Sequence, residues 1–188
     1  MKSKIIGHQK QIKLIESALN QECPFHAYIF EGKRGIGKLG IAHFAAFLIF
    51  KKYTEQPEEI LQKKITTNQH EDVIYLASEK ISIKDIRELK KRVGKTKYSP
   101  LVVIIDHFEN INAEAQHTLL KTLEEPSENT YFFILAENAS GVLPTVRSRS
   151  QTISFQKIPD TEIQKFLTSK NIETDQELIH CIDGRIDF

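Results

Sequence analysis

A glycine-rich segment that joins two apolar segments constrains the fold of this chain more than any other feature of its sequence. Residues 27–30 are the apolar run Ala-Tyr-Ile-Phe, residues 32–38 read Gly-Lys-Arg-Gly-Ile-Gly-Lys, and residues 39–50 are predominantly apolar. We expect a buried strand, a tight loop and a buried helix in that order. A phosphate-binding loop requires this order, because backbone N–H groups of the loop and of the helix start must converge on the phosphate oxygens.

The loop matches the nucleotide-binding pattern G-x-x-x-x-G-K-S/T at every position but the last. Gly32, Gly37 and Lys38 occupy the fixed positions, whereas Leu39 stands where a hydroxyl would bind magnesium. We predict a degenerate ATP site that includes Gly32, Gly35, Gly37 and Lys38 and binds ATP or ADP weakly at most. A glycine-rich turn in an α/β fold that binds no nucleotide is the alternative.

Four further apolar runs extend this alternation along the chain. These runs, which we expect to form strands, occupy residues 72–77, 101–106, 131–136 and 152–155. We expect helices at residues 9–19, 82–93 and 113–124, and one short helix near residues 58–64 in a polar stretch without a clear period. Strands that alternate with helices predict an α/β domain, here with a five-stranded, mainly parallel sheet flanked by helices.

The run at 101–105 ends in Asp106, which places a carboxylate at the edge of the sheet where ligands bind. We predict that Asp106 belongs to the nucleotide site. An ATPase of this type also needs a neighbouring carboxylate that orients the attacking water, but the next residue is His107 and Glu109 is displaced. We therefore expect no hydrolysis by the chain alone. An ATPase that itself binds and hydrolyses ATP at Lys38 and Asp106 is the alternative, and a P-loop kinase is a more distant one.

The composition excludes several broad classes of protein. The 188 residues carry 26 Lys and Arg against 25 Asp and Glu, so the chain as a whole is not a polybasic nucleic-acid binder. Its most apolar stretch, residues 41–50, is interrupted by His43 and is too short to span a bilayer. Cys23 and Cys181 stand far apart, form no metal-binding pair and fit a reducing compartment. We expect a cytoplasmic protein without a membrane partner.

Three segments together resemble a known family. Residues 26–32 read His-Ala-Tyr-Ile-Phe-Glu-Gly, residues 118–126 read Thr-Leu-Leu-Lys-Thr-Leu-Glu-Glu-Pro, and residues 143–150 read Leu-Pro-Thr-Val-Arg-Ser-Arg-Ser. In this combination the chain resembles the delta-prime family of clamp-loader subunits of bacterial DNA polymerase III, which belongs to the AAA+ superfamily. The resemblance extends from residue 5 to residue 184. It implies a AAA+ P-loop domain followed by the start of a small helical lid.

The resemblance implies a role in DNA replication. Family members work in a heteropentameric clamp loader that opens the sliding clamp and places it on primed DNA, beside subunits of the gamma/tau and delta types. The delta-prime member is implied to be rigid and not to hydrolyse ATP. The family motif Ser-Arg-Cys corresponds to Ser148, Arg149 and Ser150, which implies that Arg149 is an arginine finger for the ATP site of an adjacent subunit. Without the family, Arg149 reads as a solvated arginine at a strand edge.

Weaker correspondences add residues to the degenerate ATP site. Ile6 and Gly7 resemble the segment that flanks the adenine ring, although an apolar residue before the first helix would read in the same way. Glu137 and Asn138 lie where the resemblance places a polar residue that senses the γ-phosphate, and we take Asn138 as the candidate. The basic outer face of residues 82–93 could follow the backbone phosphates of primed DNA, or it could simply be solvated.

The domain division and the absence of metal are further expectations. Many relatives carry a four-cysteine zinc module, but residues 51–71 contain no cysteine and only His70 as a histidine, so we expect no zinc and no required cofactor. We divide the chain into a AAA+ P-loop domain at residues 1–157 and a partial helical lid at residues 158–188, with helices at 160–168 and 175–182. The family's collar domain would be absent, and we do not expect the chain to assemble a stable pentamer alone.

Overall fold

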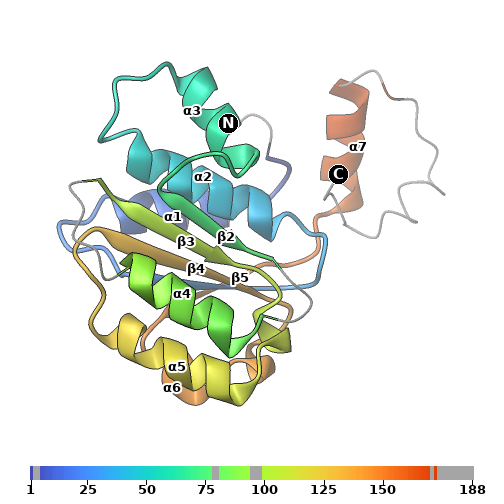
Figure 1. Cartoon of the computed structure of the whole chain (residues 1–188). Coiled ribbons are helices and arrows are strands. Elements are labelled where there is room, and N and C mark those ends of the chain that lie inside the picture. Colours follow the sequence, from blue (N-terminus) through green and yellow to red (C-terminus); the bar gives the residue numbers. More distant parts are fainter. Residues whose placement is uncertain (2–4, 78–80, 94–98, 170–171, 173–188) are drawn as a thin grey trace.

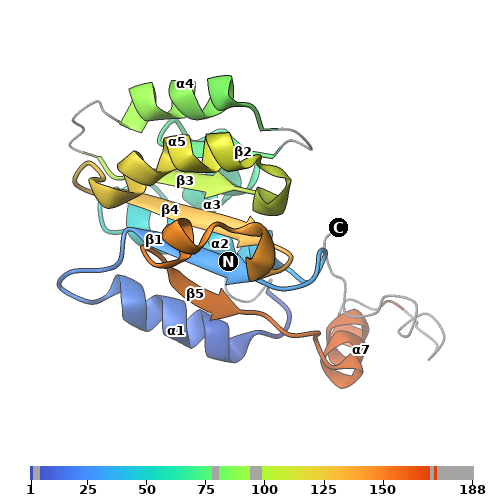
Figure 2. The same cartoon turned by 90° about the horizontal axis from the view of Figure 1, so that it is seen from below.

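A parallel β-sheet forms the centre of the molecule (Figure 1). The computed structural model describes residues 1, 5–77, 81–93, 99–169 and 172. The strands are β1 (Ala27–Glu31), β2 (Val73–Leu76), β3 (Leu101–Ile105), β4 (Thr130–Ala136) and β5 (Gln151–Ser154). They follow the order β2-β3-β4-β1-β5, and each of these pairings is parallel (Figure 2). The carboxyl ends of the strands therefore meet at one edge of the sheet, where ligands of such folds bind.

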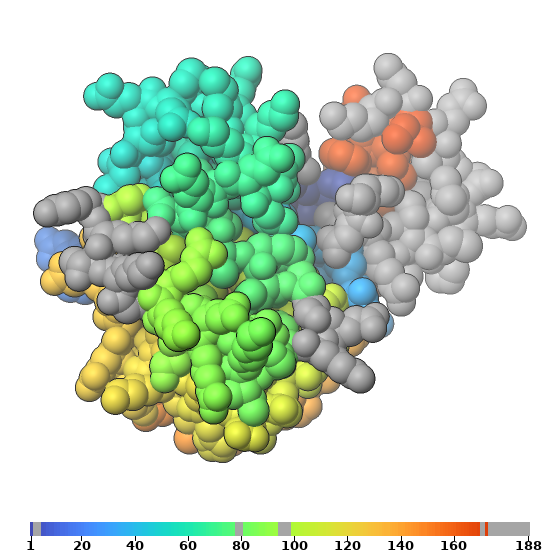
Figure 3. All heavy atoms as spheres, in the orientation of Figure 1, coloured from blue at the N-terminus to red at the C-terminus, as the bar shows by residue number. Residues whose placement is uncertain are grey.

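Helices cover both faces of this sheet. One face carries α1 (Gln9–Leu19), α2 (Lys38–Phe50) and α3 (Glu58–Thr66), and the other carries α4 (Ile83–Val93), α5 (Ala113–Glu124) and the short α6 (Pro144–Arg147). Single turns of 3-10 helix, η2 (Phe108–Asn110) and η3 (Ala139–Gly141), follow β3 and β4. Figure 3 shows α4 and α5 side by side on the outer surface of their layer.

Side chains alternate between two hydrophobic cores along the strands. In β1, Tyr28 and Phe30 belong to the core beneath α1, α2 and α3, whereas Ala27 and Ile29 belong to the core beneath α4, α5 and α6. Both faces of the sheet are thus covered, which is why the strands read as continuous apolar runs. Most residues of α2 are buried, and its sequence accordingly has no polar face.

Gln116 of α5 joins three loop segments at the end of the sheet. Its side chain is buried, with 4% of its surface exposed. Its Nε2 donates to the carbonyls of Ile111 (3.0 Å) and Gly141 (2.9 Å), and its Oε1 accepts from the backbone N–H of Leu143 (2.9 Å). Because these groups lie on the loops after β3 and β4, one amide holds η2, η3 and the start of α6 against α5.

The helix α7 (Asp160–Ser169) stands apart from the sheet (Figures 1 and 3). Its buried residues Ile163 and Leu167 form a small separate cluster with Ile6 and Ile158. The helix expected at 175–182 lies outside the described residues. The division at residues 157 and 158 stays a prediction.

The predicted fold class is confirmed, and the predicted strands and helices end within a residue or two of those observed. Residues 144–147 form a helix that the sequence reading missed, because a proline-started helix of one turn carries no periodic pattern. In the part of the chain that the structure describes, no helix is both long and apolar enough to cross a membrane.

We expect Gln116→Ala to lower the free energy of unfolding by about 3 kcal/mol, because three backbone groups would lose their hydrogen-bond partner in a mostly buried environment. Urea unfolding followed by circular dichroism measures the change. Gln62→Ala, at a partly exposed position in α3, is the matched control and should change the value by less than about 0.5 kcal/mol. Equal losses in the two variants would contradict this role for Gln116.

Candidate functional site

The glycines of the loop after β1 permit a backbone that other residues would not. Gly35 and Gly37 have φ angles of 83° and 96°, in the left-handed region that favours glycine. A Cβ atom at Gly32 would lie 2.6 Å from the carbonyl oxygen of Phe155 and 2.7 Å from Cδ1 of Ile36. The loop therefore packs directly against the chain that leaves β5, and it leads into α2 with Gly37 as the residue before the helix.

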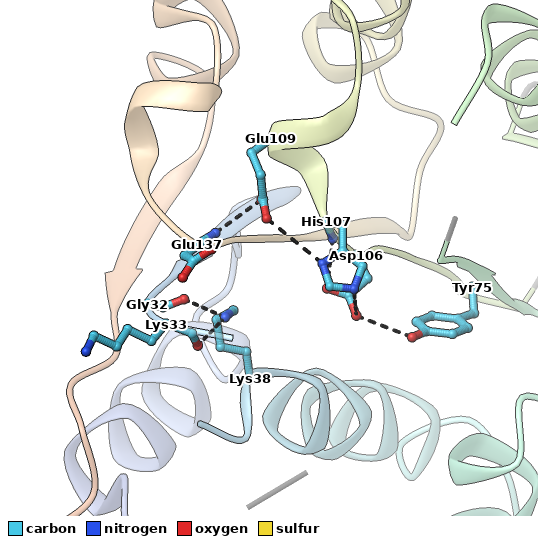
Figure 4. Close-up of polar contacts among 8 residues, drawn as sticks. All are labelled: Gly32, Lys33, Lys38, Tyr75, Asp106, His107, Glu109 and Glu137. Atoms are coloured by element: carbon cyan, nitrogen blue, oxygen red, sulfur yellow. Dashed lines mark hydrogen bonds and ion pairs between the residues drawn. The ribbon is translucent and has the colours of Figure 1, made fainter. Parts of the chain in front are cut away.

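The side chain of Lys38 is bonded to the backbone of the loop. This side chain is buried, with 8% of the residue's surface exposed. The Nζ atom donates to the carbonyl oxygens of Gly32 (2.5 Å) and Lys33 (2.8 Å), as Figure 4 shows. The ammonium group of Lys38 thus bonds two consecutive carbonyls at the start of the loop, beside a cavity that Lys38 also lines.

The opposite wall is formed by polar side chains that follow β3. Asp106 accepts a hydrogen bond from the backbone N–H of His107 (2.8 Å) and one from the hydroxyl of Tyr75 (3.4 Å). The His107 ring lies between two carboxylates, with Nε2 at 3.9 Å from Asp106 Oδ2 and Nδ1 at 3.9 Å from Glu109 Oε1 (Figure 4). Glu109 also accepts from the backbone N–H of Glu137 (3.2 Å). An imidazole therefore occupies the space between Asp106 and Glu109.

A cavity of about 240 Å³ separates the loop from this wall. Its lining residues are Arg34, Gly35, Lys38, Leu39, Asp106, His107, Glu109, Leu135, Ala136 and Glu137. The predicted residues Gly35, Lys38 and Asp106 thus come together, with Gly32 and Gly37 in the loop backbone. Arg34 was not predicted as a lining residue, although it is one of the variable residues of the loop motif. Glu137, which directly follows β4 and forms with Asn138 the predicted position of a γ-phosphate sensor, also lines the cavity.

The cavity lining carries charges of both signs. Lys38 and Arg34 are cations of the kind that a phosphate chain requires, whereas the three carboxylates among the lining residues oppose a negative charge. The side chain of Leu39 lines the cavity and offers no oxygen to a metal. Among the described residues, no group of three or more His, Cys, Asp or Glu side chains is arranged to hold a metal ion.

Three residues predicted for the ATP site belong neither to the cavity lining nor to the glycine-rich loop. Asn138 precedes η3, and its side chain accepts hydrogen bonds from the backbone N–H (3.1 Å) and the hydroxyl of Ser140. Ile6 is buried in the cluster beneath α7. Gly7 has a φ angle of 66°, and a Cβ there would lie 3.1 Å from Ile158 Cγ1. Contacts of Ile6 and Gly7 with adenine, and of Asn138 with a γ-phosphate, stay predictions.

His8 connects the loop to β5 and α7. Its Nε2 lies 2.7 Å from the carbonyl oxygen of Ile36, and its ring meets Phe155 edge-on at 5.0 Å between centroids. Burial lowers the pKa of His8 below its ordinary value of 6.5, and the positive charge of Lys38 lowers it further. The hydrogen bond with Ile36 and the charge of Glu162 act in the opposite direction and raise this pKa, but burial is the largest effect. His8 is therefore packed in its neutral form. The sequence reading missed it because an isolated histidine has no distinguishing pattern.

Arg149 lies outside the cavity lining, in the turn between α6 and β5. Its guanidinium makes a 2.6 Å ion pair with Glu124 at the end of α5. Its Nη1 donates to the carbonyl of Thr145 (2.8 Å) and to Oγ of Ser148 (3.2 Å). With 35% of its side chain exposed, Arg149 is held at the surface and is accessible from outside the molecule.

A glycine-rich loop of the P-loop type after β1, and an acidic residue after β3 at the same edge of a five-stranded parallel sheet, are features of a AAA+ P-loop protein. The fold is similar to that of the DNA polymerase III gamma subunit-related protein of Thermotoga maritima, with a TM-score of 0.60 at 18% identity over 95% of this chain and 54% of that one. The chain belongs to the family described as DNA polymerase III, delta subunit, which it matches over residues 7–159.

Individual relatives agree with this assignment. The chain is 32% identical to the DNA polymerase III subunit delta-prime of Bacillus subtilis over 168 residues, which cover 86% of this chain and 51% of the relative. It is 28% identical to the tau subunit of the same organism over 194 residues, which cover 98% of this chain and 33% of the relative. The chain thus spans about half of the delta-prime relative and a third of the tau relative.

We expect acid to destabilise the protein through His8. Its pKa is lower in the native state than the ordinary value of 6.5, so the unfolded chain binds the proton more tightly. The contribution of neutral His8 is complete above pH 6.5 and is lost as the pH falls from there toward the native pKa. The free energy of unfolding, measured between pH 7.5 and pH 5.5, should decrease less in His8→Asn than in the wild type; asparagine tolerates the left-handed backbone of His8.

His117→Asn is the matched control, since His117 is exposed on α5 and should leave the pH dependence unchanged. Burial also lowers the pKa of His43. His43 therefore contributes to the slope of the unfolding free energy against pH, and this contribution persists in both variants. A slope that is the same in wild type and His8→Asn would refute the assignment to His8.

Proposed function

We propose that this chain is a clamp-loader subunit of the DNA replication machinery that supplies Arg149 as an arginine finger to a neighbouring ATPase subunit. It helps to load the sliding clamp onto primed DNA. The observation that carries the proposal is the position of Arg149: its guanidinium is fixed at the surface and lies outside the chain's own cavity. An arginine in this position is available to a nucleotide on another subunit. Membership of the DNA polymerase III delta family supports the same role.

The chain's own cavity supports binding better than hydrolysis. Leu39 replaces the hydroxyl that would hold magnesium, and His107 occupies the position of the carboxylate that would orient water. A finger in trans needs neither group in its own subunit. It neutralises the charge that develops on the transferred phosphate, an effect worth on the order of a thousandfold or more in rate.

The partners that follow are other clamp-loader subunits of the gamma/tau and delta types, the sliding clamp and primed DNA. The outer face of α4 supports a contact with the DNA backbone, because Lys84, Arg87 and Lys91 are exposed there and no base-reading motif accompanies them. Asp85 and Glu88 on the same helix reduce the charge of this face. We assign the chain to the cytoplasm, because the bacterial relatives that it matches are subunits of DNA polymerase III.

A second function, nucleotide binding by the chain itself, is favoured by the cavity beside Lys38. The loop backbone, Lys38 and Arg34 would hold the phosphates of ATP or ADP. When bound, these phosphates would supply negative charge beside the loop. Binding would be weak, because Lys38 already bonds two loop carbonyls that it would have to release or share. We propose no required cofactor and no zinc.

Arg149→Ala in the complete subunit should reduce DNA-stimulated ATP hydrolysis by a reconstituted clamp loader about a hundredfold or more at the neighbouring site. Turnover is measured at saturating ATP, and assembly is checked by gel filtration. Arg147→Ala, which removes an exposed arginine at the end of α6, two residues before Arg149, is the control and should leave the rate unchanged. An intact complex with an unchanged rate in Arg149→Ala would remove Arg149 from the mechanism.

We expect millimolar ATP or ADP to raise the melting temperature by about 3 °C, and Lys38→Ala to abolish this rise. Differential scanning fluorimetry measures both, and the melt without nucleotide shows whether the variant is folded. Lys33→Ala is the control, because the Lys33 side chain points away from the cavity (Figure 4) and should leave the rise in place. Absence of any rise in the wild type would contradict nucleotide binding. Magnesium-dependent turnover abolished by Lys38→Ala would instead support an ATPase.

A further inference from the structure

We propose that Glu124 is a positioning residue for Arg149, which holds the guanidinium in the orientation from which it meets the nucleotide of the neighbouring subunit. This inference rests on the proposed function of Arg149. Glu124 is the last residue of α5, and its Oε1 lies 2.6 Å from Nη2 of Arg149. At this distance the contact is a charge-assisted hydrogen bond as well as an ion pair.

Three segments of the chain hold the guanidinium together. Glu124 engages Nη2 from α5, the carbonyl of Thr145 engages Nη1 from α6, and Oγ of Ser148 engages Nη1 from the turn beside Arg149. Gln116 bonds α5 to the backbone of Leu143, directly before α6. The carboxylate and the carbonyl that orient Arg149 are therefore fixed relative to each other by the fold.

The holding contacts leave the guanidinium able to act. A guanidinium has five N–H donors, and the three contacts of Arg149 within the described part of the chain engage three of them. Two donors remain for a phosphate, and 35% of the Arg149 side chain is exposed. Glu124 thus does not enclose the charge. It restricts a long side chain that would otherwise sample many rotamers, so less freedom is lost when the phosphate is contacted.

Stabilisation of the fold is a weaker explanation of the pair. The side chains of Arg149 and Glu124 are 35% and 45% exposed, and an ion pair with that access to water is largely screened. Its loss should change the orientation of Arg149 far more than it changes folding.

The test uses the reconstituted clamp loader with the complete subunit and four variants: Glu124→Gln, Glu125→Gln, Arg149→Ala, and Glu124→Gln combined with Arg149→Ala. We expect Glu124→Gln to lower kcat about tenfold with little change in KM for ATP. Glu125→Gln removes the same charge from the exposed next residue and should have no effect. The double variant should be no slower than Arg149→Ala, because Glu124 acts only through Arg149.

Each other outcome overturns the inference in a recognisable way. If Arg149→Ala is slow but Glu124→Gln has the wild-type rate, the finger stands and the positioning role fails. If Glu124→Gln is faster than wild type, the pair restrains Arg149 instead of presenting it. A double variant slower than Arg149→Ala, or poor assembly of Glu124→Gln, would show a structural role for Glu124. If Arg149→Ala itself has the wild-type rate, the proposed function fails and the role of Glu124 falls with it.

Discussion

The position of the phosphate-binding loop depends on strand β1, whose backbone is bonded on both edges. β4 pairs with one edge and β5 with the other, and the two pairings continue to the end of the strand. The N–H of Gly32 donates to the carbonyl of Ala136 (3.1 Å), and that of Phe155 donates to the carbonyl of Glu31 (2.6 Å). The loop therefore starts from a point fixed by both neighbouring strands. A side chain at Gly32 would push the backbone of Phe155 away from the loop. The shape of the loop and its packing against the chain that leaves β5 therefore depend on each other.

The same end of the sheet connects the cavity wall to the surface that carries Arg149. Glu109 binds the backbone at Glu137, and Glu31 accepts from the N–H of Ala139 (2.8 Å), so the segment after β4 is held to β1 and to η2. Gln116 then holds this segment and the start of α6 against α5. One continuous set of hydrogen bonds thus connects the wall of the chain's own cavity with the start of α6, which lies just before Arg149. Such a connection is compatible with the proposed role of Arg149 at a neighbouring subunit.

The sequence predicted those parts of the molecule that have a local pattern. The apolar runs of β1 and β3, the glycine loop and the amphipathic α4 are all found where expected, because burial on one or both faces determines those residues directly. The strand order, the contacts of Gln116 and the Glu124–Arg149 pair were not predicted, since each joins residues distant in sequence and no periodicity encodes it. The side chain of Asn138, which is predicted to sense a γ-phosphate, accepts a hydrogen bond from the backbone N–H of Ser140 in the turn that follows it.

The loop has a structural role that does not require nucleotide. Lys38 ties Gly32 and Lys33 together through their carbonyls, and the carbonyl of Ile36 anchors His8. The loop consequently joins β1, α2 and the segment that precedes α1 into one packed unit. This chain has Leu39 in place of the magnesium hydroxyl and His107 in place of the carboxylate, yet its glycines and its lysine still pack the loop. The glycine-rich loop of this chain is therefore evidence for the fold first, and it would be evidence for catalysis only if the metal and water ligands accompanied it.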